Sequence, residues 1–340
     1  MGRKNKSYYK DLHQQAYDRL NGMLAIGESK KEAVANGTDR EKIFSFNTYQ
    51  TYWKHTKYFL KYIKEAHPEC TTLKSAKKYV NEWLQLRTDQ ELSAWTIQTE
   101  AKALSKLYGI QPDDDGYFKP PKRNRADIKR SRGDRVRDRH FSEENNDELV
   151  KFCKGTGLRR SELMELRGKD LMTKAQIKAE IVRINALPVG ERSAAVDKRL
   201  EMLQDTCLFD EEYFTHVRNG KGGRKRLSPI IGQFAGQIIR RIMDTPAEEK
   251  VWQYVNTNAD IHGYRAEYAT AIYKAHARPI QDIPYDRVHR GTGRRYQSEV
   301  YTCRKDEAGK KLDKAAMLVC SKALGHNRIS VVADNYIRGL

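Results

Sequence analysis

The sequence contains little that could cross-link the chain, bind a metal ion or hold it in a membrane. Five cysteines are scattered among 340 residues, with no C-x-x-C pair and no histidine at zinc-ligand spacing. This odd set argues for reduced thiols rather than a disulfide framework, and it predicts no metal site. No apolar run approaches the roughly 20 residues that a membrane-spanning helix needs.

The amino-terminal segment also lacks the features of a targeting sequence. Its first ten residues, MGRKNKSYYK, are basic but contain no apolar core of the kind found in a signal peptide. Lys6 stands where a myristoylation motif has Ser or Thr. Together these absences predict a cytoplasmic protein with no membrane partner.

Acidic residues are too few to balance the basic ones. The chain has 64 lysines and arginines against 45 acidic residues, a formal net charge of +19. An excess of this size favours a polyanionic partner, although a solvated basic surface is the simpler alternative. The length exceeds that of a typical domain, so we expect two domains.

The amino-terminal third of the chain predicts helices. Residues 1–40 are polar, with a helix expected around Tyr9–Leu24. Between Asn47 and Lys64, aromatic and aliphatic residues recur at helical spacing. Further helices are expected at Leu73–Leu86 and Ser93–Tyr108. We therefore predict that residues 41–117 form a small helical bundle.

A basic linker is expected at residues 118–140. Pro120-Pro121 breaks any helix, and residues 119–139 hold ten basic residues and three aspartates. Such charge blocks are usually extended and solvated, and this one could follow a nucleic-acid backbone by releasing counterions. An inert linker is the alternative. The candidate DNA contacts in it are Lys122, Arg123, Arg125, Lys129, Arg130 and Arg132.

The remainder, residues 141–340, predicts mainly α structure with a small antiparallel sheet. Helices are expected at Ser142–Lys154, from Arg160 through Leu171, over Ala175–Leu203 with a break at 187–190, at Gly232–Met243 and at Gly263–Ala277. Tyr213–Val217 and Arg226–Ile231 read as two strands joined by the glycine-rich turn Asn219–Gly223. A further β-hairpin is expected as an insertion within residues 278–318.

Five short motifs in this part of the chain bring together side chains suited to attacking a phosphodiester without a metal ion. They are Thr156–Leu163, Asn219–Gly223, His262–Arg265, Leu324–His326 and Tyr336. A guanidinium is always charged and can hold two phosphate oxygens at once. A lysine between glycines can reach into a groove and protonate a leaving oxygen. A phenol, with a pKa near 10, needs nearby positive charge and a base before it attacks.

On these motifs, residues Phe141–Tyr336 resemble tyrosine recombinases of the phage-integrase type. The resemblance implies a helical core-binding domain followed by an α+β catalytic domain, the two forming a clamp around DNA. It makes Tyr336 the nucleophile and Arg159 and Arg265 the phosphate clamps. The implied roles of the other residues are orientation of Arg159 by Glu162, proton donation to the 5′ oxygen by Lys221, proton acceptance by His262 and hydrogen bonding to a non-bridging oxygen by His326.

The same resemblance sets expectations for partners and reaction. It implies cleavage and rejoining of double-stranded DNA through a 3′-phosphotyrosyl intermediate, without a cofactor, for integration or excision of a mobile element. A homotetramer on two sites is expected, with accessory DNA-bending factors as compatible partners. Residues 1–40 are then either a DNA-reading arm or a helix that links protomers. Arg224 and Lys225 are further candidate DNA contacts, and Arg160 is expected on the surface or on the DNA backbone.

Three features depart from the family pattern. His326 and Tyr336 are ten positions apart, one more than usual, and only four residues follow Tyr336. The interval from Arg265 to His326 holds the expected insertion, which either touches DNA or a neighbouring protomer or is a surface decoration. Two alternative functions remain open at this point. One is a type IB topoisomerase, and the other is a non-catalytic, sequence-specific DNA-binding protein of the same fold.

Overall fold

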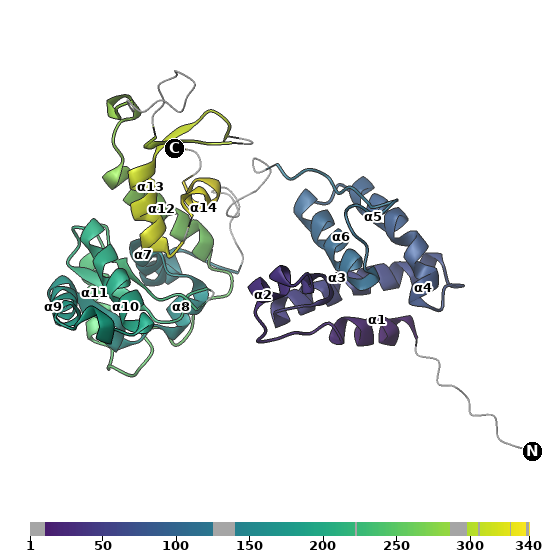
Figure 1. Ribbon diagram of the computed structural model, residues 1–340, viewed down its shortest axis with the longest axis horizontal. Helices are drawn as coiled ribbons and strands as arrows, with labels where there is room; N and C mark the ends of the chain where they lie inside the picture. Colours follow the sequence, from purple (N-terminus) through teal and green to yellow (C-terminus); the bar gives the residue numbers. More distant parts are fainter. Residues whose placement is uncertain are drawn as a thin grey trace, which may run out of the picture. The chain divides into compact units, whose positions relative to one another are not determined.

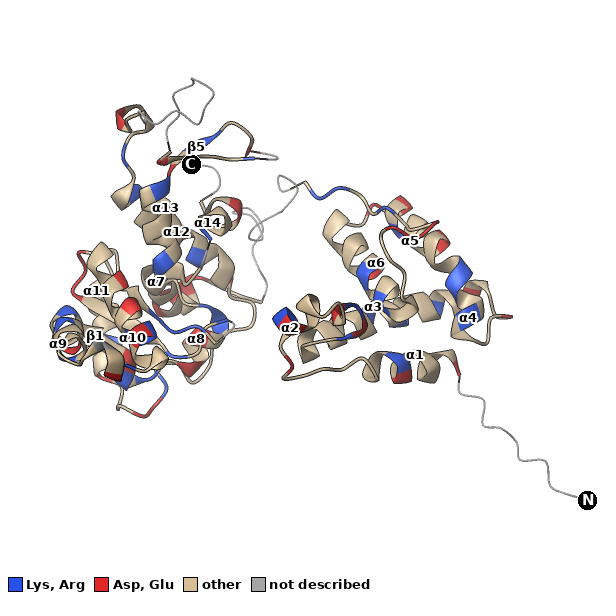
Figure 2. Ribbon diagram, viewed as in Figure 1, with Lys and Arg blue, Asp and Glu red and all other residues tan. Residues whose placement is uncertain are grey.

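The computed structural model describes residues 11–124, 140–221, 223–285, 298–304, 307–326, 328–337 and 340. The chain divides into two compact units, residues 1–127 and 128–340 (Figure 1). Figure 2 shows Lys and Arg on the helices of both units. None of the helices in the described part of the chain combines the length and apolar character that a membrane crossing requires.

The first unit is a bundle of helices around one apolar core. Its helices are α1 (Leu12–Asn21), α2 (Lys30–Ala35), α3 (Phe46–Ala66), α4 (Leu73–Ala76), α5 (Val80–Asp89) and α6 (Ala94–Tyr108). Serine side chains at Ser45 and Ser93 accept hydrogen bonds from the first turns of α3 and α6, which fixes where both helices begin. Phe59 and Ile63 of α3 are fully buried against Leu104 of α6.

One helix expected in this unit is interrupted, and another is present and packs into the core. The helix expected at Leu73–Leu86 is interrupted, because a 3-10 turn at Lys77–Tyr79 separates α4 from α5. This turn stacks Tyr79 on His67, with ring centroids 3.5 Å apart. The helix expected near the amino terminus is α1, and its residues Ala16 and Leu20 lie in the core of the bundle.

The second unit surrounds a small antiparallel sheet with helices. Its elements up to the third strand of that sheet are α7 (Asp147–Thr156), α8 (Arg160–Glu165), β1 (Leu171–Thr173), α9 (Lys174–Asn185), α10 (Ala194–Gln204), β2 (Tyr213–Val217) and β3 (Arg226–Pro229). The strand order is β1-β2-β3, with Leu171 opposite Thr215 and Thr215 opposite Ser228. The predicted hairpin is therefore present, and the pair α9–α10 is inserted between two neighbouring strands.

The remaining elements of the second unit follow the three-stranded sheet along the chain. They are α11 (Ala235–Met243), α12 (Ile261–His276), β4 (Val300–Thr302), β5 (Lys311–Asp313), α13 (Lys314–Leu324) and α14 (Ile329–Asn335). Helices α12 and α13 pack together through Ala269, Cys320 and Leu324, which are fully buried. Strands β4 and β5 pair antiparallel within the expected insertion. The basic run Arg287–Arg295 of that insertion lies outside the described residues.

The helix predicted from Arg160 through Leu171 was wrong in its second half. Helix α8 ends at Glu165, and Leu171 begins strand β1 instead. Leu166 is extended and its carbonyl accepts a hydrogen bond from the Val251 amide at 2.9 Å. Sequence periodicity could not reveal this pairing, because its partner lies 85 positions downstream.

The preceding helix also differs from expectation at both ends. The Ser142 hydroxyl does accept a hydrogen bond from the Asn145 amide, but it starts a 3-10 turn at Glu144–Asn146 rather than α7 itself. At the other end, Gly155 lies inside α7 rather than framing a turn. The helix stops at Gly157, which is left-handed with φ 59°.

Candidate active site

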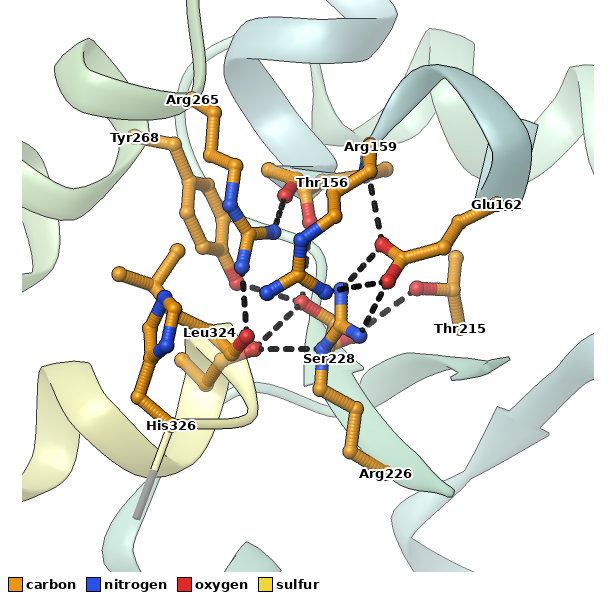
Figure 3. A network of polar contacts seen from close by, with 12 residues as sticks. Thr156, Arg159, Glu162, Thr215, Arg226, Ser228, Arg265, Tyr268, Leu324 and His326 are labelled. Carbon is orange, nitrogen blue, oxygen red and sulfur yellow. Dashed lines mark hydrogen bonds and ion pairs between the residues drawn. The ribbon is translucent and has the colours of Figure 1, made fainter. Parts of the chain in front are cut away.

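Arg159 is held in place by the helix that it starts. It is the N-cap of α8, and its backbone amide donates to Glu162 Oε2 at 2.8 Å. Its Nη1 donates to Glu162 Oε1 at 2.6 Å (Figure 3). Because Glu162 is the third residue of α8, it is well placed to close back on the N-cap. The carboxylate fixes one edge of the guanidinium.

A second arginine donates hydrogen bonds to the carboxylate of Glu162. Arg226, at the start of β3, donates from Nη1 to Glu162 Oε1 at 2.9 Å and from Nη2 to Oε2 at 2.7 Å. Its Nε donates to the Ala323 carbonyl at 3.0 Å. Sequence reasoning missed Arg226, because it ends a basic run that resembles an exposed turn. The signal available was its place as the first residue of an otherwise uncharged strand.

Arg265 is the most deeply buried cation of the site, at 1% exposure. It lies just after the first turn of α12 and donates to the carbonyls of Gly157 and Leu324. Burial and the nearby charges of Arg226 and Arg159 lower the pKa of Arg265 to about 10, opposed by Tyr336 and Glu162. It remains a cation at neutral pH, so a compact positive centre forms where α8, β3 and α12 meet.

The Tyr336 side chain lies against this centre, and its backbone directly follows the last described helix, α14. Its hydroxyl lies 3.4 Å from Arg265 Nε and 3.2 Å from His326 Nε2. Tyr336 is 9% exposed and follows α14 directly. Burial, with the charges of Arg265, Arg159 and Arg226, lowers the pKa of His326 to about 4. At neutral pH this imidazole is uncharged and has a lone pair that can accept a proton.

Two glycines allow the backbone to approach the arginines closely. A Cβ on Gly325, which is left-handed with φ 69°, would lie 2.8 Å from Arg226 Cδ. A Cβ on Gly220 would lie 2.6 Å from the Arg224 carbonyl oxygen and 3.4 Å from Glu162 Oε1. Both glycines belong to the motifs that carry His326 and Lys221, so these motifs are packed directly onto the charged centre.

His262 and Lys221 lie at its border. Burial lowers the pKa of His262, and the charges of Arg265, Arg159 and Lys221 act in the same direction, against Asp260. His262 makes no hydrogen bond to Tyr336 in the described part of the chain, which differs from the contact that a proton acceptor needs. Lys221 is exposed at the turn between β2 and β3, with its ammonium free of side-chain ion pairs among the described residues.

The residues expected on the surface or on DNA divide into three groups. Arg160 is half-buried, and it donates to four carbonyls of the loop before α12, those of Val255, Asn256, Thr257 and Ala259. Lys122, Arg123, Arg224 and Lys225 are exposed. Arg125, Lys129, Arg130 and Arg132 lie outside the described residues.

A cavity of about 1020 Å³ adjoins the charged centre. Its lining includes Gly325, His326 and Arg226 from the charged centre, and Arg224 and Lys225 next to β3. Lys198 and Arg199 of α10 also line it, together with the acidic residues Glu180, Glu201 and Asp205. The positive centre therefore adjoins a cavity in which basic residues outnumber acidic ones, and which is large enough for a nucleotide.

Chemically, the arrangement is that of an anion site with an attached phenol. The guanidiniums of Arg159 and Arg226 share the Glu162 carboxylate, and that of Arg265 lies close by (Figure 3). Three cations against one anion leave net positive charge beside the Tyr336 hydroxyl. Guanidiniums aimed at one point stabilise the extra charge of a pentacoordinate phosphorus. In the described residues, no cluster of three His, Cys, Asp or Glu side chains is arranged as a metal site.

Comparisons with known proteins add little to this geometry. Models of protein families give no match, and no curated protein matches the sequence. Among solved structures, the chain is similar to one described as the crystal structure of XerA recombinase, at 13% identity. That similarity covers 95% of this chain and 94% of the other, with a TM-score of 0.25. At this score the two structures do not superpose closely enough to argue a shared function.

Proposed function

We propose that the chain is a DNA strand-exchange enzyme that cleaves and rejoins DNA through a covalent bond to Tyr336. The observation that carries the proposal is the position of the Tyr336 hydroxyl, 3.4 Å from Arg265 Nε and 3.2 Å from His326 Nε2. These neighbours come from helix α12 and from the turn after α13, 71 and 10 positions away in the chain. A phenol beside a buried cation and a neutral imidazole is suited to nucleophilic attack.

In the proposed reaction, Arg159 and Arg265 hold the non-bridging oxygens of one phosphodiester. The Tyr336 oxygen forms a bond to phosphorus while the bond from phosphorus to the 5′ oxygen breaks. The bound phosphate offsets the arginine charges that lower the pKa of His326, so His326 Nε2 becomes basic enough to take the phenolic proton. Lys221 gives a proton to the departing 5′ oxygen. The distances favour His326 over His262 as the acceptor, since of these two histidines only His326 contacts the hydroxyl.

The product of this step is a 3′-phosphotyrosyl bond and a free 5′ hydroxyl. Because one phosphoester replaces another, the step conserves bond energy and needs no nucleotide cofactor. Attack by the 5′ hydroxyl of a second duplex then completes strand exchange. We infer a clamp around duplex DNA, four protomers on two sites, and integration or excision of a mobile element as the setting. The exposed cations Arg224 and Lys225, which line the cavity, support a DNA substrate.

The direct test is a suicide substrate made from a pool of duplexes with a random core and a nick near the cleavable strand's end. Cleavage releases a short fragment, so religation is prevented and an SDS-resistant adduct accumulates. Wild type is expected to form adducts, whereas Tyr336→Phe binds the pool equally well and forms none. Tyr254→Phe, at a tyrosine that is 67% exposed, is the matched control and should behave as wild type. Adducts from Tyr336→Phe would contradict the proposal.

The same enzyme chemistry would also serve a type IB topoisomerase. The two functions differ in which strand is rejoined. Duplexes selected from the pool should yield four-way junctions between two identical sites if the chain is a recombinase. Relaxation of supercoiled plasmid by single protomers, without junctions, would assign it as a topoisomerase instead.

A further inference from the structure

One carboxylate is shared by two arginines in a way that leaves their roles unequal. Arg226 donates one hydrogen bond to each oxygen of Glu162, at 2.9 Å and 2.7 Å. The Arg159 guanidinium donates to the same carboxylate from one nitrogen only, Nη1, and the Arg159 backbone amide donates to it as well. The bidentate partner of Glu162 is therefore Arg226, and most of the Arg159 guanidinium is left for another anion.

Arg226 is poorly suited to any role on the surface. It is 5% exposed, as is Glu162, and its Nε is occupied by the Ala323 carbonyl. Gly325 approaches so closely that a Cβ there would lie 2.8 Å from Arg226 Cδ, and one on Gly220 would be in contact with Arg226 Nη1 at 3.5 Å. This packing holds the guanidinium against Glu162 and keeps it away from bulk solvent.

A buried ion pair of this kind is weak evidence for stability, because the cost of desolvation offsets the attraction between the charges. Its effect on the neighbouring charge is clearer. If Glu162 faced Arg159 alone, the carboxylate would neutralise the guanidinium that the phosphate needs. With Arg226 present, Glu162 can orient Arg159 without cancelling its charge.

We propose that Arg226 is a positioning residue that offsets the charge of Glu162, so that Arg159 is oriented by the carboxylate and still binds the scissile phosphate as a full cation. This inference rests on the proposed function and adds a residue that acts through Glu162 rather than on the DNA. It requires that the loss of Arg226 be harmful only while Glu162 carries its charge.

The test is a double-mutant cycle on Glu162 and Arg226. The quantity measured is the single-turnover rate of adduct formation, and the substrates are nicked duplexes from the pool that form adducts with wild type. Glu162→Gln should slow the reaction about tenfold, the scale of one weakened hydrogen bond. Arg226→Met should slow it about 100-fold, the scale for losing a preorganised charge interaction, because Glu162 now pairs fully with Arg159. Arg226→Met combined with Glu162→Gln should recover to the rate of Glu162→Gln alone.

Three further measurements separate positioning from loss of structure. Duplex affinity, measured by fluorescence anisotropy, should stay within about threefold of wild type in every variant, since most phosphate contacts are elsewhere. Arg226→Lys should be intermediate, because an ammonium keeps the charge without the paired hydrogen bonds. Arg240→Met, an exposed arginine of α11, is the control and should match wild type.

The outcomes discriminate even if Arg226→Met fails to fold. The double variant contains no unpaired buried charge, so its comparison with Glu162→Gln carries the test alone. Equal rates support the inference, and a double variant more than tenfold slower than Glu162→Gln overturns it. An Arg226→Met rate equal to that of wild type also overturns it. Absence of any adduct from wild type would instead refute the proposed function, and this inference with it.

Discussion

Glu162 accepts hydrogen bonds from two arginines and one backbone amide while almost wholly removed from solvent. Burial alone would raise the pKa of this carboxyl, but Arg226, the Arg159 amide and Arg265 outweigh it and hold the pKa well below its usual range. The carboxylate is therefore charged across the whole physiological range. At this scale the site is an electrostatic arrangement in which one anion organises several cations.

Individual residues of this centre differ in how readily the sequence predicts them. Arg159 and Glu162 could be paired in advance, because three positions on a helix start bring side chain and N-cap together. Arg226 could not, since its carboxylate partner lies 64 positions away and its own neighbours are basic and glycine-rich. The contacts of Arg160 could not be predicted for the same reason, because its carbonyl partners belong to a loop that is distant in the sequence.

Lys221 yields a prediction at the residue scale. Its ammonium is exposed at the hairpin turn and is assigned the proton that the 5′ oxygen needs. Lys221→Ala should slow adduct formation by about 100-fold or more on ordinary duplexes, as expected for loss of a general acid. Sulfur is a better leaving atom and does not need that proton, so a substrate with 5′-bridging sulfur should react within about tenfold of wild type.

The control for this measurement is Lys178→Ala, at an exposed lysine on α9, which should leave both substrates unaffected. Equal losses on the oxygen and sulfur substrates would show that Lys221 has another role.

At the scale of elements, the sequence predicted helices and strands more reliably than their ends. Strand β2 was placed correctly, and β3 begins where expected, because alternating residues flank a glycine-rich turn. The end of α8 and the presence of β1 could not be read locally, since Leu166 and Leu171 pair with Val251 and Thr215 far along the chain. Tertiary hydrogen bonds overrode the helical period there.

Helices α9 and α10 are tied to the sheet by a small polar cluster. Arg199 of α10 donates to both oxygens of Glu180 on α9, at 2.8 Å and 2.7 Å. It also lies 3.2 Å from His216 Nε2 on β2. Burial, together with Arg199 and Arg218, lowers the pKa of His216 to about 4. The neutral imidazole thus accepts a hydrogen bond from Arg199 that its protonated form could not.

This cluster predicts how stability depends on pH. A histidine with a lower pKa in the folded chain binds its proton more readily when unfolded, so its contribution is complete above about pH 6.5 and declines toward pH 4. Between these values, His216 should add up to about 1.4 kcal/mol per pH unit to the slope of the unfolding free energy. Urea unfolding at several pH values measures this slope.

His326, also with a pKa near 4, should contribute a second slope of the same sign. His262, whose pKa is also lowered, should contribute in the same direction. His216→Gln is therefore expected to reduce the slope by less than half, and not to abolish it. Parallel curves for wild type and His216→Gln would contradict the assignment of His216 as neutral in the folded chain.

At the scale of the whole molecule, composition predicts a polyanionic partner, and the order of motifs predicts attack on a phosphodiester. The +19 charge favoured a polyanion, and exposed cations do line the cavity beside the candidate site. The motifs at residues 159, 265, 326 and 336 meet in the second unit, as their chemistry required. Sequence reasoning could not provide the contacts between them, because those depend on helix packing over long separations.

Strand exchange through Tyr336 requires one chemical linkage above all, a phosphate ester between the Tyr336 oxygen and the 3′ end of a cleaved strand. Adducts trapped on the nicked duplex pool can be digested with protease and nuclease and then sequenced by mass spectrometry. The peptide carrying a nucleotide should contain Tyr336, joined through a 3′ phosphate. A nucleotide on any other residue, or a 5′ phosphate linkage at Tyr336, would contradict the account.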